Sequence, residues 1–116
     1  MPDATLLECF PTPTDTPFVI EHVNEEFTSV CPKTGHPDFA RIILRYQPGK
    51  QCVELKSLKL YLQRFRQEGI FYENVTNRIL DDFIDMVQPR RVMIESRWNA
   101  RGGITSVIRV QHPVES

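Results

Sequence analysis

The sequence lacks an excess of either charge and lacks a long apolar run. Its 14 lysines and arginines balance 15 aspartates and glutamates, so the net charge is −1. This balance gives no reason to expect a nucleic acid or a membrane surface as partner. The longest apolar runs fall far short of the ~18–20 residues that a membrane span needs. No basic segment followed by an apolar core stands at the N-terminus, so we expect no secretory signal.

Cysteine and glycine motifs are also scarce. The three cysteines, Cys9, Cys31 and Cys52, are odd in number and irregularly spaced. They do not make a disulfide framework, and reduced thiols in the cytoplasm fit them better. No Cys-x-x-Cys or His-x-x-x-His spacing favours zinc, so we expect no metal. The Gly-x-Gly-x-x-Gly fingerprint of dinucleotide-binding folds does not occur.

Length and composition favour a single domain with an N-terminal arm. The chain has 116 residues, of which 41% are hydrophobic and 25% charged, as in an ordinary globular domain. Four of its nine prolines lie within residues 1–17, which predicts an extended arm that is too proline-rich for a helix. Leu6, Leu7, Cys9 and Phe10 would dock this arm on a surface or on a neighbouring subunit. Residues 18–116 form the domain.

Alternating apolar and polar residues predict four strands. The first covers residues 18–30, with a bulge at Asn24–Glu26, and the second covers 39–47. The third and fourth cover 92–98 and 104–110, and a hairpin connection at 99–103 joins them.

Between the two strand pairs, the apolar spacing becomes helical. Leu55, Leu58, Tyr61, Leu62 and Phe65 predict a helix over 54–67 that ends at Gly69, and a second helix follows over 73–87. The order is strand, strand, helix, helix, strand, strand. It is typical of an α+β domain with a four-stranded antiparallel sheet and two helices on one face. Such a sheet has two open edges, which an oligomer can pair.

Two segments carry chemistry. Cys31 and Asp38 lie in a loop with two prolines and one glycine, near Lys33 and His36. A thiol with cationic neighbours can react as thiolate, and Asp38 can carry a proton. The alternative is a tight turn with a buried structural cysteine.

The octapeptide Glu54–Tyr61 sets an acid and two lysines at the start of the first predicted helix. Lys56 and Lys59 share one helical face, and with free backbone N–H groups they would hold a phosphate. A solvated helix rim is the alternative. The octapeptide resembles, at every position, the signature of the NADPH-dependent 7-cyano-7-deazaguanine reductases, the QueF-type nitrile reductases of queuosine biosynthesis. The resemblance extends to the Cys31–Asp38 loop, Phe71–Glu73 and Arg101–Gly103, and covers residues 18–112.

The resemblance implies the tunnelling fold (T-fold), in which several subunits close an oligomeric barrel with active sites at subunit interfaces. For this chain it implies a decamer of two pentameric rings. Cys31 would attack the nitrile carbon of the substrate to give a thioimide, and Asp38 would protonate the nitrogen.

The resemblance also implies which residues bind the two ligands. The 7-deazaguanine nitrile would contact Glu54, Phe71, Tyr72 and Glu73, with Glu73 accepting from the guanine-like edge. NADPH would be used twice, and its phosphates would contact Lys56, Lys59 and Arg101. Loss of Lys59 or Arg101 would then weaken NADPH binding and spare thioimide formation. No direct contact with nucleic acid is expected.

Two positions depart from the family pattern. Tyr72 stands where many members have histidine, and Val75 stands where some have a second cysteine that protects the nucleophile from oxidation. Three rival functions stay open. They are an archaeosine-type amidinotransferase acting on nitrile-bearing tRNA, a metal-dependent cyclohydrolase of the same superfold, and a non-catalytic ring-forming binding module with an inert Cys31.

Overall fold

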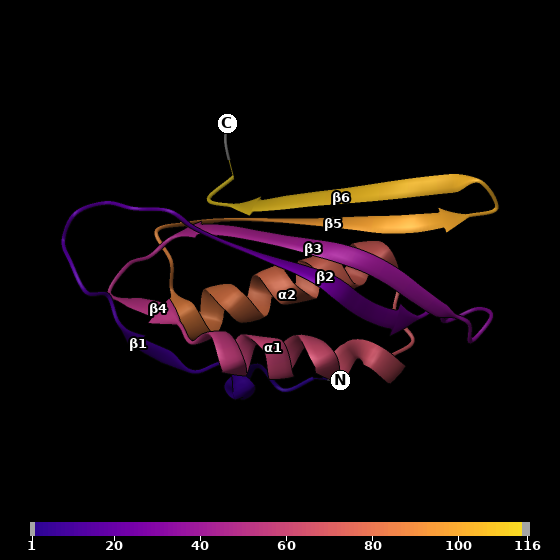
Figure 1. Ribbon diagram of the computed structural model, residues 1–116, viewed down its shortest axis with the longest axis horizontal. Coiled ribbons are helices and arrows are strands. Elements are labelled where there is room, and N and C mark those ends of the chain that lie inside the picture. Colours follow the sequence, from indigo (N-terminus) through magenta and orange to yellow (C-terminus); the bar gives the residue numbers. More distant parts are fainter. Residues whose placement is uncertain (1, 115–116) are drawn as a thin grey trace.

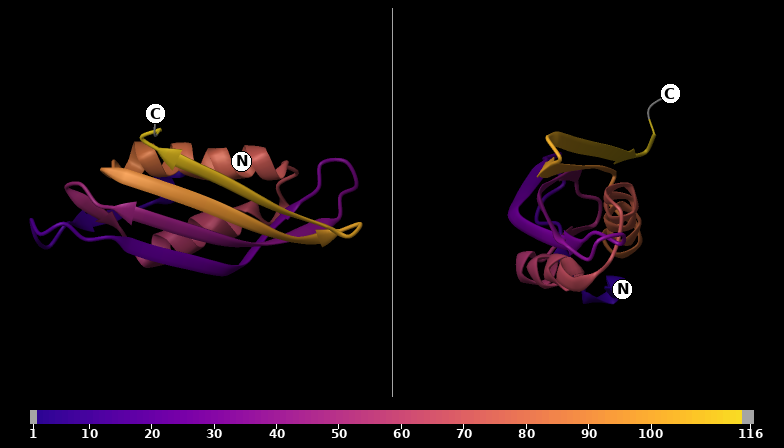
Figure 2. Two further views of the ribbon diagram at one scale, coloured as in Figure 1. Left: turned by 90° about the horizontal axis from the view of Figure 1, so that it is seen from above. Right: turned by 90° about the vertical axis from the view of Figure 1, so that its right-hand side faces the viewer.

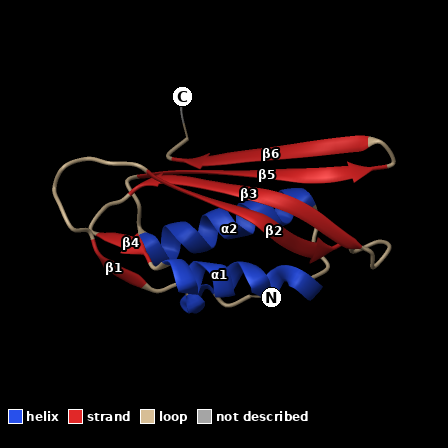
Figure 3. Ribbon diagram, in the orientation of Figure 1, coloured by secondary structure: helices blue, strands red, loops and turns tan. Residues whose placement is uncertain are grey.

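The computed structural model describes residues 2–114, in which two α-helices lie on one face of a four-stranded antiparallel sheet (Figures 1 and 3). The elements in chain order are η1 (Ala4–Leu6), β1 (Cys9–Pro11), β2 (Ile20–Val30), β3 (Pro37–Gln47), β4 (Gln51–Val53), α1 (Leu55–Gln63), η2 (Arg64–Gln67), α2 (Tyr72–Val87), β5 (Arg91–Arg101) and β6 (Ile104–His112), where η marks a short 3-10 helix. Within residues 2–114, the helices are too short or too polar to cross a membrane.

The sheet has the strand order β2-β3-β5-β6, so β2 and β6 are its edges. The predicted bulge is present, because the register of β2 against β3 shifts between Asn24 and Phe27. Gly102 and Gly103 form the β5–β6 turn with φ of 58° and 79°, a conformation that glycine adopts without strain. The predicted α+β class, sheet and helix arrangement are confirmed.

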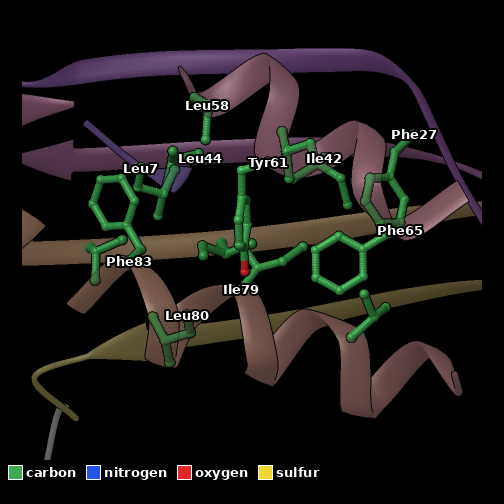
Figure 4. Close-up of a cluster of buried hydrophobic side chains, with 14 of the residues drawn as sticks. Leu7, Phe27, Ile42, Leu44, Leu58, Tyr61, Phe65, Ile79, Leu80 and Phe83 are labelled. Carbon is green, nitrogen blue, oxygen red and sulfur yellow. The ribbon is translucent and has the colours of Figure 1, made fainter. Parts of the chain in front are cut away.

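The core lies between the sheet and the two helices (Figure 4). On β3, the side chains of Ala40, Ile42, Leu44 and Tyr46 are buried, as the alternation predicts. They meet large side chains from the helical layer, which include Tyr61, Phe65, Ile79 and Phe83. In the part of the chain that the structure describes, both helices lie on this one face, and the opposite face of the sheet has no helix against it (Figure 2).

Helix α1 differs from its prediction at both ends. Glu54 caps it, since its carboxylate accepts from the backbone N–H groups of Lys56 and Ser57, and this cap places Leu55 at the first helical position. Leu55 is 60% exposed, so its prediction as part of the buried stripe is wrong. The helix continues as η2 after Gln63 and ends before Gly69.

The N-terminal segment packs against its own chain. β1 pairs with β4, and Leu7 is buried in the core. The expectation of a helix-free arm is wrong at Ala4–Leu6, where Asp3 caps one 3-10 turn by accepting from the backbone N–H of Thr5. The boundary between arm and domain at residue 17 stays a prediction.

We expect Tyr46→Phe to lower the free energy of unfolding by about 1–3 kcal/mol. The Tyr46 hydroxyl accepts from the backbone N–H of Val53 at 3.0 Å in a buried position, and its removal leaves that N–H without a partner. Urea denaturation measures the change. Val19→Ala, at a side chain that is 63% exposed, should change the value by less than about 0.5 kcal/mol. Equal stability of Tyr46→Phe and the unsubstituted protein would contradict the prediction.

Candidate active site

Three segments meet at one end of the molecule. They are the β2–β3 loop, the start of α2 and the end of β5 (Figures 1 and 2). Together they line a cavity of about 160 Å³. Six of the nine predicted site residues lie there, namely Cys31, Asp38, Phe71, Tyr72, Glu73 and Arg101. The structure thus gathers segments that are far apart in the sequence into one candidate site.

Backbone hydrogen bonds fix the cysteine loop beside α2. The Val30 N–H donates to the Glu68 carbonyl at 2.9 Å, and the Ile70 N–H donates to the Val30 carbonyl at 3.0 Å. Val30 therefore forms a parallel bridge with Gly69. This bridge sets Cys31, the next residue, beside the Phe71–Glu73 segment.

The loop itself activates Cys31. The hydroxyl of Thr34 donates to the Cys31 sulfur, as do the backbone N–H groups of Thr34 and Lys33 and, to a smaller extent, the side chain of Arg101. These hydrogen bonds lower the pKa of Cys31 to about 7, because each of them stabilises the thiolate. A substantial fraction of Cys31 is therefore nucleophilic at neutral pH.

From the loop sequence, Lys33 and His36 were predicted to activate the thiol as nearby cations or donors, and no role was predicted for Thr34. The missed signal is a hydroxyl residue placed just before a glycine turn. Gly35 has a φ of 74° and donates its N–H to the Cys31 carbonyl at 2.9 Å, which folds Thr34 back toward the sulfur.

We expect Thr34→Val to raise the pKa of Cys31 above about 7, because it removes the largest stabilising hydrogen bond. The rate of alkylation by iodoacetamide follows the thiolate fraction, so its midpoint should move to higher pH. A pKa higher by one slows alkylation about tenfold at pH values below both midpoints. Thr34→Ser should keep the original midpoint, as should Thr105→Val, at an exposed position on β6. Identical midpoints for Thr34→Val and the unsubstituted protein would show that the hydroxyl does not act on the thiol.

Asp38 is buried at the inner wall of the cavity, where it is 3% exposed. Its Oδ1 accepts from Arg101 Nη1 at 2.5 Å and from the Tyr72 hydroxyl at 3.2 Å. Burial raises the pKa of Tyr72, and the negative charge of Asp38 raises it further. Tyr72 therefore keeps its proton and acts as a donor. The hydrogen bond to Asp38 likewise raises the pKa of Arg101.

Tyr72 is held by an aromatic stack. Its ring lies parallel to that of Trp98, with centroids 3.9 Å apart and an interplanar angle of 7°. The indole N–H of Trp98 donates to Ser96 Oγ at 2.9 Å, and that oxygen lies 2.7 Å from Thr76 Oγ1. The alternation of apolar and polar residues predicted only that Trp98 lies in a strand. Its stack on Tyr72 joins β5 to α2, and a contact between segments so far apart in the sequence leaves no local pattern.

The other three predicted site residues lie elsewhere. Glu54 caps α1. Lys59 lines a larger cavity of about 370 Å³, which has walls from β2 and α1 and also includes Arg66. Lys56 is exposed on α1 and lines neither cavity. One chain therefore does not bring the three predicted phosphate-binding cations together, and the ligand roles of these residues stay predictions.

The two remaining thiols lie far from the candidate site. Cys9 and Cys52 lie in β1 and β4, at the end of the molecule opposite the Cys31 loop (Figure 1). Among residues 2–114, no three histidine, cysteine, aspartate or glutamate side chains group in a way that could hold a metal ion.

An activated thiol and a buried carboxylate that line one cavity have the chemistry that thiol-dependent catalysis requires. The chain belongs to the family described as QueF-like protein, whose model matches residues 37–116. This confirms the resemblance found from the sequence motifs.

Curated relatives in this family carry the name NADPH-dependent 7-cyano-7-deazaguanine reductase. The protein from Rhodopirellula baltica is 61% identical over 95% of this chain and 92% of its own length. Those from Chlorobaculum tepidum and Chlorobium phaeovibrioides are 58% and 54% identical, and the matches cover 84% and 95% of this chain and 84% and 96% of theirs.

A solved structure supports the fold independently. The apo crystal structure of the archaeosine synthase QueF-Like matches with a TM-score of 0.76, and the match covers 89% of this chain and 99% of that one. Its sequence identity is 16%, so the match shows the fold alone.

Proposed function

We propose that this protein reduces the nitrile of 7-cyano-7-deazaguanine to an aminomethyl group with two NADPH, in queuosine biosynthesis. The observation that carries the proposal is the pairing of Cys31, whose pKa is lowered to about 7, with the buried Asp38 in one cavity. The names of relatives that are 54–61% identical support the substrate and the cofactor.

Covalent addition is the first step. The Cys31 thiol gives its proton to Asp38, and the thiolate attacks the nitrile carbon. The S–C bond forms as one π bond of the nitrile breaks, and Asp38 passes the proton to the nitrogen. The product is a thioimide, whose C=N bond accepts hydride more readily than the free nitrile does.

The start of α2 suits recognition of the substrate ring. Phe71 is 47% exposed at the cavity and offers an aromatic face for stacking. Glu73, exposed in the first turn of α2, can accept from two N–H groups of a guanine-like edge. When a ring without those N–H donors binds, the carboxylate is left without hydrogen-bond partners. The site therefore disfavours such rings.

NADPH supplies the two hydrides. The larger cavity has features that fit such a cofactor, because the apolar walls of Leu58 and Leu62 lie next to the cations Lys59 and Arg66. Two carboxylates, Glu25 and Glu26, also line this cavity, and Glu25 is paired with Arg41. We assign the phosphate groups of NADPH to Lys59 and Arg66, because these are the lysine and the arginine in the cavity lining.

We expect Lys59→Ala to raise the KM for NADPH by roughly tenfold, the cost of one charge-assisted contact. Thioimide formation should be unchanged, because it precedes hydride transfer. Steady-state kinetics and adduct formation without NADPH measure the two quantities. Lys50→Ala, in the β3–β4 connection, is the matched control. An unchanged KM in Lys59→Ala would indicate that the lysine is only a solvated rim charge.

We also propose that the chain works as a homo-oligomer in the cytoplasm. The edges β2 and β6 can pair with other copies and extend the sheet, and the family resemblance favours a decamer of two pentameric rings. A reduced thiol and NADPH both suit the cytoplasm. Analytical ultracentrifugation tests the assembly, and an active monomer at micromolar concentration would exclude it.

The test of the function uses 7-cyano-7-deazaguanine first without and then with NADPH. Mass spectrometry should show a covalent adduct on Cys31, and added NADPH should release the amine with two NADPH oxidised per nitrile. 7-Deazaguanine without the nitrile is the control and should give neither signal. Failure of both signals would overturn the proposal. Amidine formation on nitrile-bearing tRNA without NADPH would favour the amidinotransferase instead.

A further inference from the structure

Two donors converge on a single oxygen of Asp38. Arg101 Nη1 lies 2.5 Å and the Tyr72 hydroxyl 3.2 Å from Oδ1, so both of these hydrogen bonds go to the same carboxylate oxygen. Because Asp38 is 3% exposed, water has little access to compete for these contacts. The oxygen that already accepts two hydrogen bonds, one of them from a cation, is the poorer place for a proton. A proton carried by Asp38 therefore belongs on Oδ2.

Arg101 also contacts the loop that holds the nucleophile. Its Nη2 lies 3.5 Å from Thr34 Oγ1, and its side chain donates to the sulfur of Cys31. One planar guanidinium thus spans the acid and the thiol, and its fork fixes the angle between the groups that it bonds.

Tyr72 is fixed in turn by its stack on Trp98. A ring held parallel to a buried indole has little freedom to rotate, so its hydroxyl stays aimed at Asp38. The network from Trp98 through Ser96 to Thr76 anchors the indole between β5 and α2.

We infer that Arg101 and Tyr72 are positioning residues, which hold Asp38 by Oδ1 so that Oδ2 carries the proton from the Cys31 thiol to the nitrile nitrogen. The inference rests on the proposed function. In this step the S–H bond breaks and an O–H bond forms on Oδ2. The S–C bond then forms, one C–N π bond breaks, and the proton moves from Oδ2 to nitrogen. Asp38 ends as the carboxylate that Arg101 and Tyr72 stabilise.

This role separates Arg101 from the lysines of α1. The family resemblance implied that Arg101 binds NADPH together with Lys56 and Lys59. On that assignment, loss of Arg101 would spare adduct formation. The structure places Arg101 in the cavity of Cys31 and Asp38, and Lys59 in the other cavity. Arg101 should therefore act in the step that needs no cofactor.

The experiment measures adduct formation from 7-cyano-7-deazaguanine without NADPH, and in parallel the alkylation of Cys31 by iodoacetamide. We expect Arg101→Ala to slow adduct formation by about 10–100-fold, the cost of a misplaced catalytic group. Alkylation needs only the thiolate, so it should slow by less than about threefold, in keeping with the minor share of Arg101 in the Cys31 hydrogen bonds. Arg97→Ala removes an exposed arginine of the same strand that pairs with Glu95, and it should change neither rate.

Two further variants keep the test valid if Arg101→Ala does not fold, which thermal unfolding would reveal. Arg101→Lys keeps the charge without the fork and should give an intermediate adduct rate. Tyr72→Phe keeps the stack on Trp98 and removes one donor, so we expect a slowing of about 3–10-fold. In the double variant, Arg101→Ala with Tyr72→Phe, the combined loss should be smaller than the product of the single losses, because both donors act through Oδ1.

The outcomes distinguish this inference from the proposed function. Wild-type adduct rates in Arg101→Ala or Arg101→Lys, together with a raised KM for NADPH, would overturn the positioning role and leave the proposed function intact. Equal slowing of adduct formation and alkylation would also overturn it, because the effect would then lie on the thiol. If the unsubstituted protein forms no adduct, the proposed function fails, and this inference fails with it.

Discussion

Replacement of Cys31 by alanine is expected to abolish the thioimide and to lower turnover by roughly 10³-fold or more, the usual scale for loss of a nucleophile. Cys31 is the thiol that the Thr34 turn activates and that shares a cavity with Asp38. Intact-mass spectrometry after addition of the nitrile measures the adduct, and NADPH oxidation measures turnover.

Cys9→Ala is the matched control for this prediction. Cys9 lies in β1, and burial raises the pKa of its thiol, so it is a poor nucleophile at neutral pH. We expect the Cys9→Ala variant to form the adduct and to turn over at the same rates as the unsubstituted protein. An adduct that persists in Cys31→Ala would mean that the nucleophile has been misassigned.

Asp38→Asn should slow adduct formation by about 10²–10⁴-fold, the usual contribution of a positioned acid or base. The amide has the shape of the carboxyl group and its oxygen can still accept from Arg101 and Tyr72, but it cannot carry the proton. Single-turnover measurement without NADPH gives the rate. Thiol alkylation should be affected far less, because iodoacetamide accepts no proton from the enzyme.

Asp85→Asn, at an exposed position on α2, controls for the loss of a negative charge and should leave both rates unchanged. A proportional loss of adduct formation and alkylation in Asp38→Asn would point to a role in thiolate formation or folding. Asp38 would then not be the proton carrier to nitrogen.

Local patterns were sufficient to predict the main elements of the fold. The alternation along 39–47 gives the buried face of β3 because strand periodicity is a property of neighbouring residues. The pairing of β1 with β4 could not be predicted in this way, since each strand has three residues and their contact depends on tertiary packing. Leu55 was misplaced because the Glu54 cap, and not hydrophobicity, sets where the helix begins.

The site was predictable where a motif lies in one segment. The Cys31–Asp38 loop was predicted from its residue types and Phe71–Glu73 from the family resemblance, and the structure brings the two segments to one cavity. The role of Thr34 had a local signal, a hydroxyl residue just before Gly35, which was missed. The role of Trp98 depends on a contact between α2 and β5, which no spacing in the sequence marks. Glu54 was assigned to the substrate, whereas within one chain its carboxylate caps α1.

The location of the three thiols determines how the protein responds to peroxide. Oxidation of Cys31 gives a sulfenic acid, which a nearby second thiol would normally trap as a disulfide. Val75 stands where the family resemblance implies a second cysteine in some members, and it is fully buried. Cys9 and Cys52 lie at the far end of the molecule. Within one chain, Cys9 and Cys52 are therefore too far from Cys31 to trap its sulfenic acid, and we expect recovery to need a thiol from outside the chain, such as glutathione. Without that thiol, further oxidation to the sulfinic acid makes the loss of activity permanent.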